Sequence, residues 1–356
     1  MPAMPASHRY RGRRAAVVES DALRVTVLEE GGHIAEIFDK RSGVNPLWTP
    51  PWTSIEPSTY TPSRHGEYGD GTDAMLLAGI MGHNLCLDIF GGPSDAEAAA
   101  GLTPHGEASV VRYELSVGGT IMTASADLPF AGLRVAREIA LEDRSVKIRE
   151  SVENLTACDR PIGWTQHVTL GPPFLEKGRT EFRASATRSK VFEQPFGVAD
   201  DLASGALFDW PLAPRADGGV TDLRRLTDAR ASSAYTAHLM NTSDEQSFFV
   251  AFSPALRLAF GYVWKREDFP WLGIWQENHS RTHRPWNGAA LACGMEFGVS
   301  PMPETRRDMI ERGRLFDVPT FRWIPAGTRV EAAYWAIARD ADAVPDTLAV
   351  PASSIS

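Results

Sequence analysis

Cysteine is scarce in this sequence and is not arranged as a metal-binding or disulfide motif. The 356 residues contain three cysteines, Cys86, Cys158 and Cys293, which lie far apart and form no CxxC pair. A disulfide framework or a cysteine zinc site requires paired or closely spaced thiols. We therefore expect three reduced, buried cysteines.

Long apolar segments and blocks of basic residues are also absent. No apolar run approaches the ~20 residues of a membrane-spanning helix, and the net charge is −9. The arginine cluster at residues 11–14 is confined to the N-terminal end, so neither a membrane nor a nucleic acid is an expected partner. Residues 1–14 contain no apolar stretch followed by a cleavage site, so we expect a soluble, cytoplasmic protein.

Apolar and polar residues alternate with a period of two in many short segments. Residues 15–38, 133–141 and 145–154 are clear examples, and Gly118-Gly119 is typical of a hairpin turn. No repeat of fixed period is present, and helical patterns are few. Many short strands with little helix predict an all-β fold, a large antiparallel β-sandwich.

The length is compatible with one large β domain. We expect this single domain to span residues 15–340. A flexible tail at residues 1–14 precedes it, and a second tail at residues 341–356 follows it.

The stretch at residues 161–174 contains the first candidate for acid–base chemistry. Gln166 and His167 end an alternating apolar run, and Gly171-Pro172-Pro173 closes the stretch. This pattern predicts that His167 is presented at a strand edge rather than sealed in a core.

Two other stretches provide residues that complement His167. Upstream, His105 and Glu107 flank Gly106. Downstream, Glu296 follows Cys293-Gly-Met in an apolar segment. Glu277, next to Trp275-Gln276, also ends an apolar run and rivals Glu296 as a base, while Trp275 offers an aromatic face for sugar C–H groups.

The order of these motifs resembles the aldose 1-epimerase, or galactose mutarotase-like, superfamily. The resemblance covers roughly residues 15–340 and rests on Gly31-Gly32, His105-Gly106, His167 after Glu153-Asn154, and Glu296. It implies a β-supersandwich in which His105, His167 and Glu296 are catalytic. Where the family has an arginine before its His-Gly motif, this chain has His83 and Asn84 nearby, with Arg64 as another candidate. We assign the following residues to substrate binding: His83, Asn84, Arg64, Glu107, Gln166, Trp275 and Glu277.

The chemistry can also be argued from the residues. Opening a cyclic hemiacetal requires a base for the proton of the anomeric hydroxyl and an acid for the ring oxygen. Glu296 suits the base, because its apolar surroundings raise its pKa, and His167 suits the acid. His105 could hydrogen-bond the ring oxygen or share the acid role. The substrate is then a small-molecule carbohydrate, and the reaction needs neither a cofactor nor a metal.

Three alternatives remain open at this stage. A metal-assisted sugar lyase or isomerase would use His83, His105, Glu107 and His167 as ligands. A glycoside hydrolase would use Glu277 and Glu296. A non-catalytic carbohydrate-binding protein would need none of this acid–base chemistry. The sequence names neither the sugar nor the oligomeric state.

Overall fold

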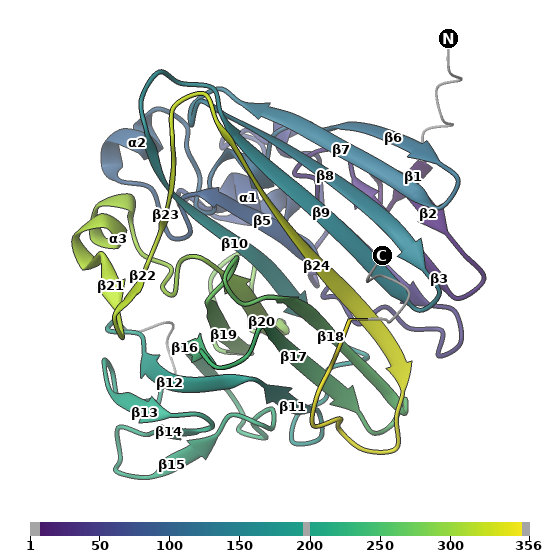
Figure 1. The fold of residues 1–356 in the computed structure, drawn as a ribbon, viewed down its shortest axis with the longest axis vertical. Helices are drawn as coiled ribbons and strands as arrows, with labels where there is room; N and C mark the ends of the chain where they lie inside the picture. Colours follow the sequence, from purple (N-terminus) through teal and green to yellow (C-terminus); the bar gives the residue numbers. More distant parts are fainter. Residues whose placement is uncertain (1–7, 195–199, 351–356) are drawn as a thin grey trace.

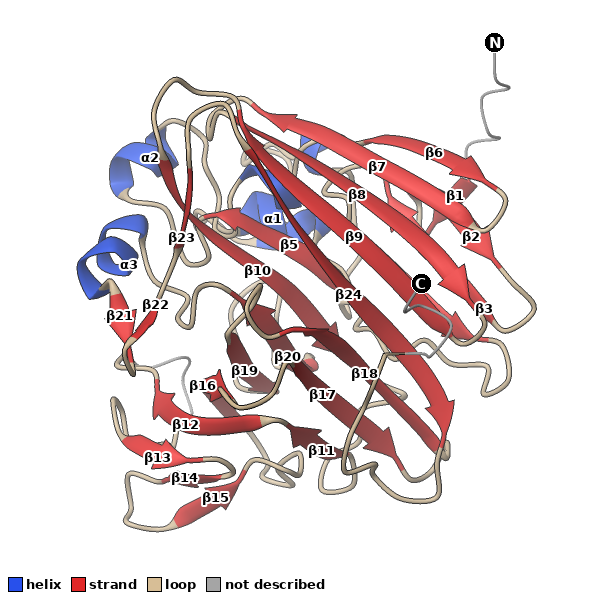
Figure 2. Ribbon diagram, in the orientation of Figure 1, coloured by secondary structure: helices blue, strands red, loops and turns tan. Residues whose placement is uncertain are grey.

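The computed structural model describes residues 8–194 and 200–350, which form two large antiparallel sheets and few helices (Figures 1 and 2). In spatial order, the larger sheet contains β1 (His8–Tyr10), β2 (Arg13–Glu19), β3 (Leu23–Leu28), β4 (Ile34–Asp39), β5 (His83–Asp88), β10 (Arg160–Leu170), β20 (Leu291–Gly298), β19 (Trp271–Asn278), β16 (Ser232–Met240), β12 (Ala186–Val191) and β13 (Leu207–Asp209), with β23 (Arg322–Ile324) paired to β10.

In Figure 1 the strands of the smaller sheet run diagonally, in nearly the same direction as β5 and β10 of the larger sheet. The order of the smaller sheet is β11 (Glu181–Ala184), β17 (Gln246–Ser253), β18 (Leu258–Lys265), β24 (Arg329–Asp340), β9 (Ser145–Asn154), β8 (Leu133–Glu142), β7 (Ile121–Leu128) and β6 (Glu114–Gly118). The remaining elements are two ribbons, β14 (Leu212–Pro214) with β15 (Val220–Asp222) and β21 (Arg314–Leu315) with β22 (Val318–Pro319), the helices α1 (Ala74–Gly79), α2 (Asp95–Ala99) and α3 (Arg306–Arg312), and the 3₁₀ turns η1 (Pro57–Thr59), η2 (Gly66–Tyr68) and η3 (Glu107–Ser109). The predicted all-β sandwich is therefore confirmed.

The main core lies between the two sheets and is rich in aromatic side chains. Trp164 of β10 and Phe297 of β20 face Trp264, Tyr334 and Phe249 of the smaller sheet. The rings of Trp264 and Phe297 stack with their centroids 4.3 Å apart. Such pairs add to the stabilisation from apolar burial, which makes this interface the rigid support of the larger sheet.

The outer face of the larger sheet is also covered. Trp48 and Trp286, from loops, and Leu76 and Leu77, from α1, pack there against Trp275 of β19. Strands β5, β10, β19 and β20 are consequently buried on both faces. A polar side chain on the outer face of these strands meets a third layer of loops rather than open solvent.

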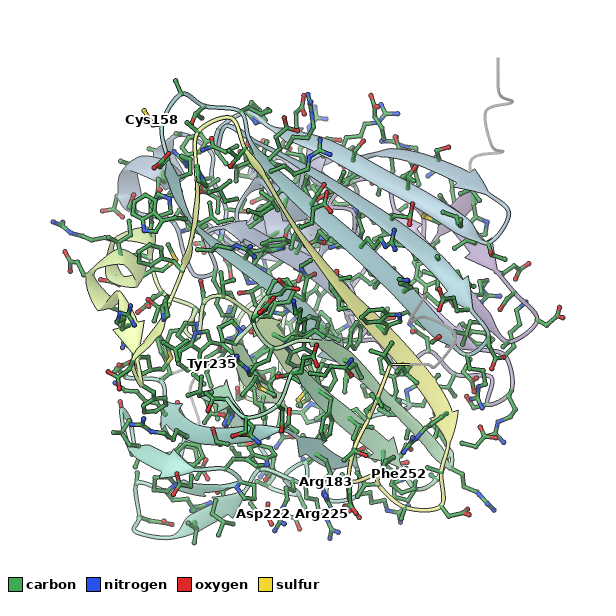
Figure 3. All side chains as sticks on the ribbon, in the orientation of Figure 1. Cys158, Arg183, Asp222, Arg225, Tyr235 and Phe252 are labelled. Carbon is green, nitrogen blue, oxygen red and sulfur yellow. The ribbon has the colours of Figure 1, made fainter. Side chains whose placement is uncertain are left out.

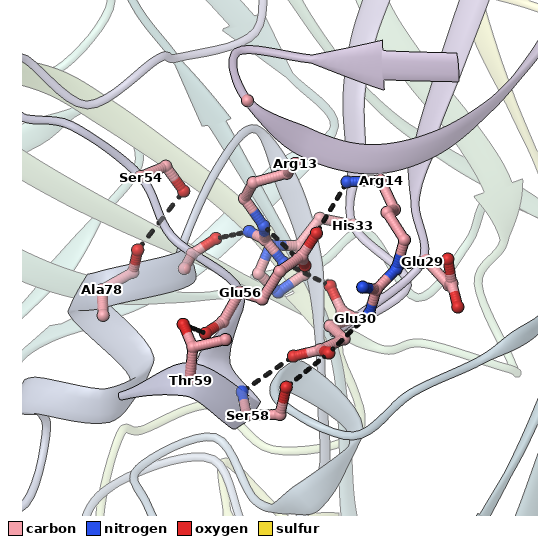
Figure 4. A network of polar contacts seen from close by, with 12 residues as sticks. Arg13, Arg14, Glu29, Glu30, His33, Ser54, Glu56, Ser58, Thr59 and Ala78 are labelled. Carbon is pink, nitrogen blue, oxygen red and sulfur yellow. Dashed lines mark hydrogen bonds and ion pairs between the residues drawn. The ribbon is translucent and has the colours of Figure 1, made fainter. Parts of the chain in front are cut away.

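The ordered sheet begins earlier than the expected domain boundary at residue 15. Arg13 is fully buried, and its guanidinium donates to the carbonyl oxygens of Gly79 and Glu30 and to Oε2 of Glu56, the last at 3.3 Å (Figure 4). The backbone N–H of Arg14 donates to Oε1 of Glu56 at 2.6 Å. This network ties β2 to the loop before α1, so residues 8–14 are structural. Residues 1–7 of the expected tail lie outside the described residues.

Two further expectations need correction. The segment after residue 340 packs on the smaller sheet, where Leu348 is buried beside Val250 and Ile337. Cys86 and Cys293 are buried as expected, but Cys158 is exposed at one end of the molecule (Figure 3). Among the described residues, no helix is long and apolar enough to cross a membrane.

Candidate active site

His167, Glu296 and Asn84 share one face of the larger sheet because their strands are in register. In the antiparallel pairing, His167 of β10 lies directly opposite Glu296 of β20 on one side and Asn84 of β5 on the other. Residues directly opposite each other across such a ladder point to the same face. The prediction that His167 sits at a strand edge is wrong, because β10 continues to Leu170 before the turn at Gly171.

The side chains of His167 and Glu296 are in direct contact. Nε2 of His167 lies 3.0 Å from Oε1 of Glu296, and Nδ1 of His167 lies 3.1 Å from Oγ1 of Thr169. The distance between Nε2 and Oε1 is short, yet the N–H of the ring does not point at Oε1 as a hydrogen bond requires. No other described side chain or backbone group bonds to that oxygen. The carboxyl of Glu296 is therefore left with unused hydrogen-bonding capacity.

His105 reaches the same place from a loop that is anchored on β5. Its φ is +71°, and the backbone N–H of Leu87 donates to its carbonyl oxygen at 3.1 Å. Gly106 is required next, because its φ is +76° and a Cβ there would lie 2.2 Å from the carbonyl oxygen of Leu87. The resulting ring position is 4.7 Å from the ring of His167, centroid to centroid.

Asn84 sets the orientation of His105. Its Nδ2 lies 3.3 Å from Nδ1 of His105. An amide N–H₂ only donates, so Nδ1 accepts, and the proton of the neutral ring is then on Nε2. His105 is thereby prepared to donate a hydrogen bond from Nε2.

Burial raises the pKa of the carboxyl and lowers the pKa values of the two histidines. Glu296 is 2% exposed, and burial raises the pKa of its carboxyl well above the ordinary glutamate value. Burial lowers the pKa of His167 to about 4 and that of His105 well below the ordinary histidine value. In each case the charged form loses hydration that the protein does not replace. Such shifts in one cavity are typical of acid–base sites.

The three groups line a cavity of about 160 Å³ between the larger sheet and its outer layer. Arg281 closes one side, with its guanidinium carbon 5.4 Å and 4.7 Å from the ring centroids of Trp275 and Trp286. The cavity lining is Asp73, Leu76, Leu77, Ile80, Phe90, Pro104, His105, His167, Tyr235, Trp275, Arg281, Trp286, Glu296 and Pro303.

Glu277, the rival base, does not line this cavity. It is fully buried, and its carboxylate accepts from the backbone N–H groups of Ser280 and Arg281 at 2.7 Å and 3.1 Å, and from Oγ of Ser280. The Nε atom of Arg281 lies 3.4 Å from its Oε2. Glu277 therefore holds the turn that carries Arg281, and its oxygens are occupied.

Besides Glu277, four of the expected substrate-binding residues lie elsewhere. His83 and Gln166 occupy the opposite face of the sheet, where Nε2 of His83 lies 3.0 Å from Oε1 of Gln166. Glu107 accepts from the backbone N–H groups of Phe130 and Ala131, and Arg64 is exposed on a loop. Within residues 8–194 and 200–350 no three or more His, Cys, Asp or Glu side chains gather as a metal-binding group. The four donors of the lyase hypothesis do not converge.

Sequence reasoning missed three polar residues of the cavity, Arg281, Tyr235 and Asp73. Tyr235 lies inside the molecule (Figure 3), and its hydroxyl donates to the carbonyl oxygen of Pro301 at 3.0 Å. The polar run from Glu277 to Arg281 after an apolar strand is a signal that could have indicated Arg281. Asp73 and Tyr235 come from distant segments, so only the fold brings them to the cavity.

Comparison with known proteins places the fold. No protein-family model and no curated protein matches the sequence. A protein from Klebsiella pneumoniae named as a candidate aldose 1-epimerase superposes with a TM-score of 0.65 and 13% identity over 94% of this chain and 82% of that chain. A galactose mutarotase-like protein from Clostridium acetobutylicum gives 0.60 and 12% over 92% and 96%. One from Lactobacillus casei gives 0.58 and 13% over 91% and 100%. At these identities the likeness is one of fold, and the chain has the galactose mutarotase-like β-sandwich fold.

Proposed function

We propose that this protein interconverts the anomers of a reducing sugar by opening and reclosing the sugar ring. One observation carries the proposal: a buried carboxyl and two buried histidines meet in one cavity, with pKa values shifted in opposite directions by burial. The likeness to proteins described as aldose epimerases or mutarotases adds support at the level of fold.

The proton balance assigns a role to each member of the pair. Glu296 as carboxylate accepts the proton of the C1 hydroxyl while protonated His167 donates to the ring oxygen, and the bond between C1 and that oxygen breaks. The open aldehyde rotates about the C1–C2 bond and closes on its other face. The two protons then return, so the protein is unchanged.

The shared proton sets the form of the pair that reacts. The pKa shifts put this proton on Glu296 and leave His167 neutral, so the reactive form, with Glu296 a carboxylate and His167 an imidazolium, is a minor form of the resting pair. Burial opposes this ionised form, and the proton transfers that open the ring return both groups to their neutral forms. His105, with its proton on Nε2, supplies a second donor for the ring oxygen.

The walls suit one sugar ring. Trp275 and Trp286 present apolar faces for C–H groups, and Arg281 and Asp73 present groups for hydroxyls. A cavity of about 160 Å³ is close to the ~150 Å³ that holds a benzene ring in an engineered protein. It therefore fits a single ring more closely than it fits a sugar chain.

The same geometry ranks the alternatives below this function. The hydrolase hypothesis needs Glu277 free, but its oxygens hold the Ser280–Arg281 turn. A purely binding protein would not need an acid and a base whose pKa values burial shifts in opposite directions. We also propose that the protein acts in the cytoplasm.

NMR exchange spectroscopy of α and β anomers, over a panel of aldoses with purified wild-type protein, tests the proposal. We expect exchange faster than the spontaneous rate on at least one sugar, in proportion to protein concentration. Treatment with a chelator should leave the rate unchanged. Absence of any acceleration across the panel would reject the proposal, and loss of the activity on chelation would favour the metal-assisted alternative.

A further inference from the structure

Thr169 lies beside His167 on the cavity face of β10. One residue separates the two along the strand, so their side chains share a face. Oγ1 of Thr169 is 3.1 Å from Nδ1 of His167, and both residues are buried. The cavity wall includes His167 but not Thr169. An effect of the Thr169 hydroxyl on a ligand in the cavity therefore passes through the ring of His167.

The backbone holds Thr169 in place from both sides. Its N–H donates to the carbonyl oxygen of Gly82 at 3.1 Å, and its carbonyl oxygen accepts from the N–H of Trp48 at 2.7 Å. The residue opposite on β20 is Gly294, and a Cβ there would overlap Oε1 of Glu296, so the carboxyl of Glu296 fills this space. Because threonine is branched at Cβ, its χ1 angle is restricted. The hydroxyl therefore has a defined position beside Nδ1.

The proposed reaction uses the other ring nitrogen. Nε2 of His167 lies 3.0 Å from Oε1 of Glu296. A histidine that takes up and releases a proton at Nε2 keeps a proton on Nδ1 in both its neutral and its protonated form. The group that faces Nδ1 must then accept a hydrogen bond. The hydroxyl of Thr169 can do so, because its oxygen has two lone pairs.

A second acceptor faces the same nitrogen. The backbone of His167 itself forms a hydrogen bond that acts to raise the pKa of the ring, against the larger lowering effect of burial. A carbonyl oxygen only accepts, and Nδ1 is the ring nitrogen that is close to the backbone of its own residue. The surroundings of Nδ1 therefore favour a proton on this nitrogen.

We infer that Thr169 is a positioning residue for the acid of the proposed reaction. Its Oγ1 accepts a hydrogen bond from Nδ1–H of His167, which keeps Nε2 as the nitrogen that takes up and releases the catalytic proton. The effect on turnover rests on the proposed function, whereas the position of the proton on the neutral ring does not. Because the hydroxyl is neutral, it orients the ring without the negative charge that an aspartate supplies in a Ser-His-Asp triad.

Two substitutions separate the hydroxyl of Thr169 from the shape of its side chain. Thr169→Val keeps the branched shape and removes the acceptor, and Thr169→Ser keeps the acceptor and removes a methyl group. Thr165→Val is the matched control. Thr165 lies on the same face of β10 and is fully buried, and its Oγ1 has no hydrogen-bond partner within the described part of the chain. Circular dichroism checks that each variant is folded.

Ring ¹⁵N NMR of protein labelled at histidine shows which nitrogen carries the proton, and the spectrum of His167→Asn identifies the signals of His167. Neutral pH is well above the pKa of about 4, so the ring is neutral there. We expect the proton on Nδ1 in wild type, Thr169→Ser and Thr165→Val. In Thr169→Val the share of rings with the proton on Nε2 should rise about tenfold. A wild-type ring with its proton on Nε2, or an unchanged share in Thr169→Val, would overturn the inference.

Anomer exchange gives the second readout. In Thr169→Val kcat should fall about tenfold, equivalent to about 1.4 kcal/mol, with KM within about twofold. Thr169→Ser and Thr165→Val should keep kcat within about twofold. An unchanged kcat in Thr169→Val, or an equal fall in Thr169→Ser, would reject the role in turnover. If wild type exchanges no anomers on any sugar, the proposed function fails, and the position of the ring proton alone decides whether Thr169 orients His167.

Discussion

The two faces of β10 contact similar buried groups, but the hydrogen bonding of these groups differs. On the interior face, Gln166 meets His83 and Glu150, and on the outer face His167 meets Glu296. Each face thus holds a buried histidine and a buried glutamate, on or beside one strand. The difference lies in how far the hydrogen-bonding groups are satisfied.

The interior carboxylate is saturated. Glu150 accepts from Nε2 of Gln166 at 2.6 Å, from Nε of Arg137 at 2.8 Å and from the indole N–H of Trp164. Tyr334 donates its hydroxyl to Oε1 of Gln166 at 2.9 Å, which extends the network. A buried carboxylate with several donors holds the sheets in one arrangement and has no acceptor capacity left for a ligand.

The outer carboxyl is not saturated. Glu296 has His167 at 3.0 Å and, among the residues described, no hydrogen-bond donor with good geometry to Oε1. An unsatisfied buried group costs stability, and sites that accept this cost are commonly functional. Histidine and glutamate side by side are therefore weak evidence for catalysis, whereas unused hydrogen-bonding capacity in a cavity is stronger evidence.

The largest effect is expected on the interior face. Glu150→Gln removes the charge that balances Arg137 and should cost about 3–5 kcal/mol of unfolding free energy, the range for breaking one side of a buried ion pair. Urea unfolding followed by circular dichroism measures this cost. Glu138→Gln, at an exposed position of the neighbouring strand β8, is the control and should change stability by less than about 0.5 kcal/mol. A similar small loss in both variants would remove the contrast between the two faces.

On the outer face the expected effect is on turnover. Glu296→Gln keeps the shape of the side chain but removes the base, so kcat for anomer exchange should fall by at least about 10²-fold with little change in KM. His167→Asn should have a comparable effect by removing the acid. Stability should change little in Glu296→Gln, because no described hydrogen bond to Oε1 is lost. Full activity in Glu296→Gln would transfer the base role to another group.

The pH dependence sharpens the comparison. His167 and Glu296 share one proton between the lowered histidine pKa of about 4 and the raised glutamate pKa, so kcat/KM should form a plateau in this interval. Below about 4 a second proton removes the base, and above the raised pKa of Glu296 the acid is lost. An acidic limb near the ordinary histidine value of about 6.5 would contradict this account of burial.

Folding must be checked at the acidic end of that profile. Burial lowers the pKa values of His33 and His238 to about 3, so the unfolded chain binds protons at these sites before the folded chain does. Stability is therefore lost as the pH falls from the ordinary histidine value of about 6.5 towards about 3. Circular dichroism at each pH separates this loss from the titration of the active pair.

Much of the fold can be predicted from the sequence, because alternating apolar and polar residues indicate a strand with one buried face. In β8, Leu133, Val135 and Ile139 face the core, and Arg134 and Glu138 are exposed. Period-two patterns of this kind identified strands of both sheets, including residues 15–38 of the larger one. The sandwich prediction depended on these strands.

The site could be predicted only in part, because its strands are buried on both faces. His83 and Asn84 are adjacent, as are Gln166 and His167, and in each pair only the second residue lies on the cavity face. Because neither face of these strands is polar, the sequence does not indicate whether the odd- or the even-numbered residues point to the cavity. The motif order singled out His105, His167 and Glu296, but the pairing of β5, β10 and β20 is what brings these residues together.

The smallest expected effect comes from substituting Glu277. It tests whether a buried carboxylate whose hydrogen bonds are all made is structural rather than catalytic. In Glu277→Gln the amide oxygen can take the place of Oε1 and accept the same hydrogen bonds from the backbone N–H groups of Ser280 and Arg281. The amide N–H₂ then takes the place of Oε2. Oγ of Ser280 can turn to accept from this amide, but Nε of Arg281 is a donor, so its ion pair with Oε2 at 3.4 Å is lost. Arg281 is partly exposed at 22%, so the loss should be about 1 kcal/mol and appear as a roughly fivefold rise in KM. Because Glu277 touches neither the reacting atoms nor their proton donors, kcat should stay within about twofold, and Arg281→Lys should reproduce the change in KM. A large fall in kcat instead would mean that the occupied carboxylate takes part in proton transfer, and saturation would no longer distinguish a structural acid from a catalytic one.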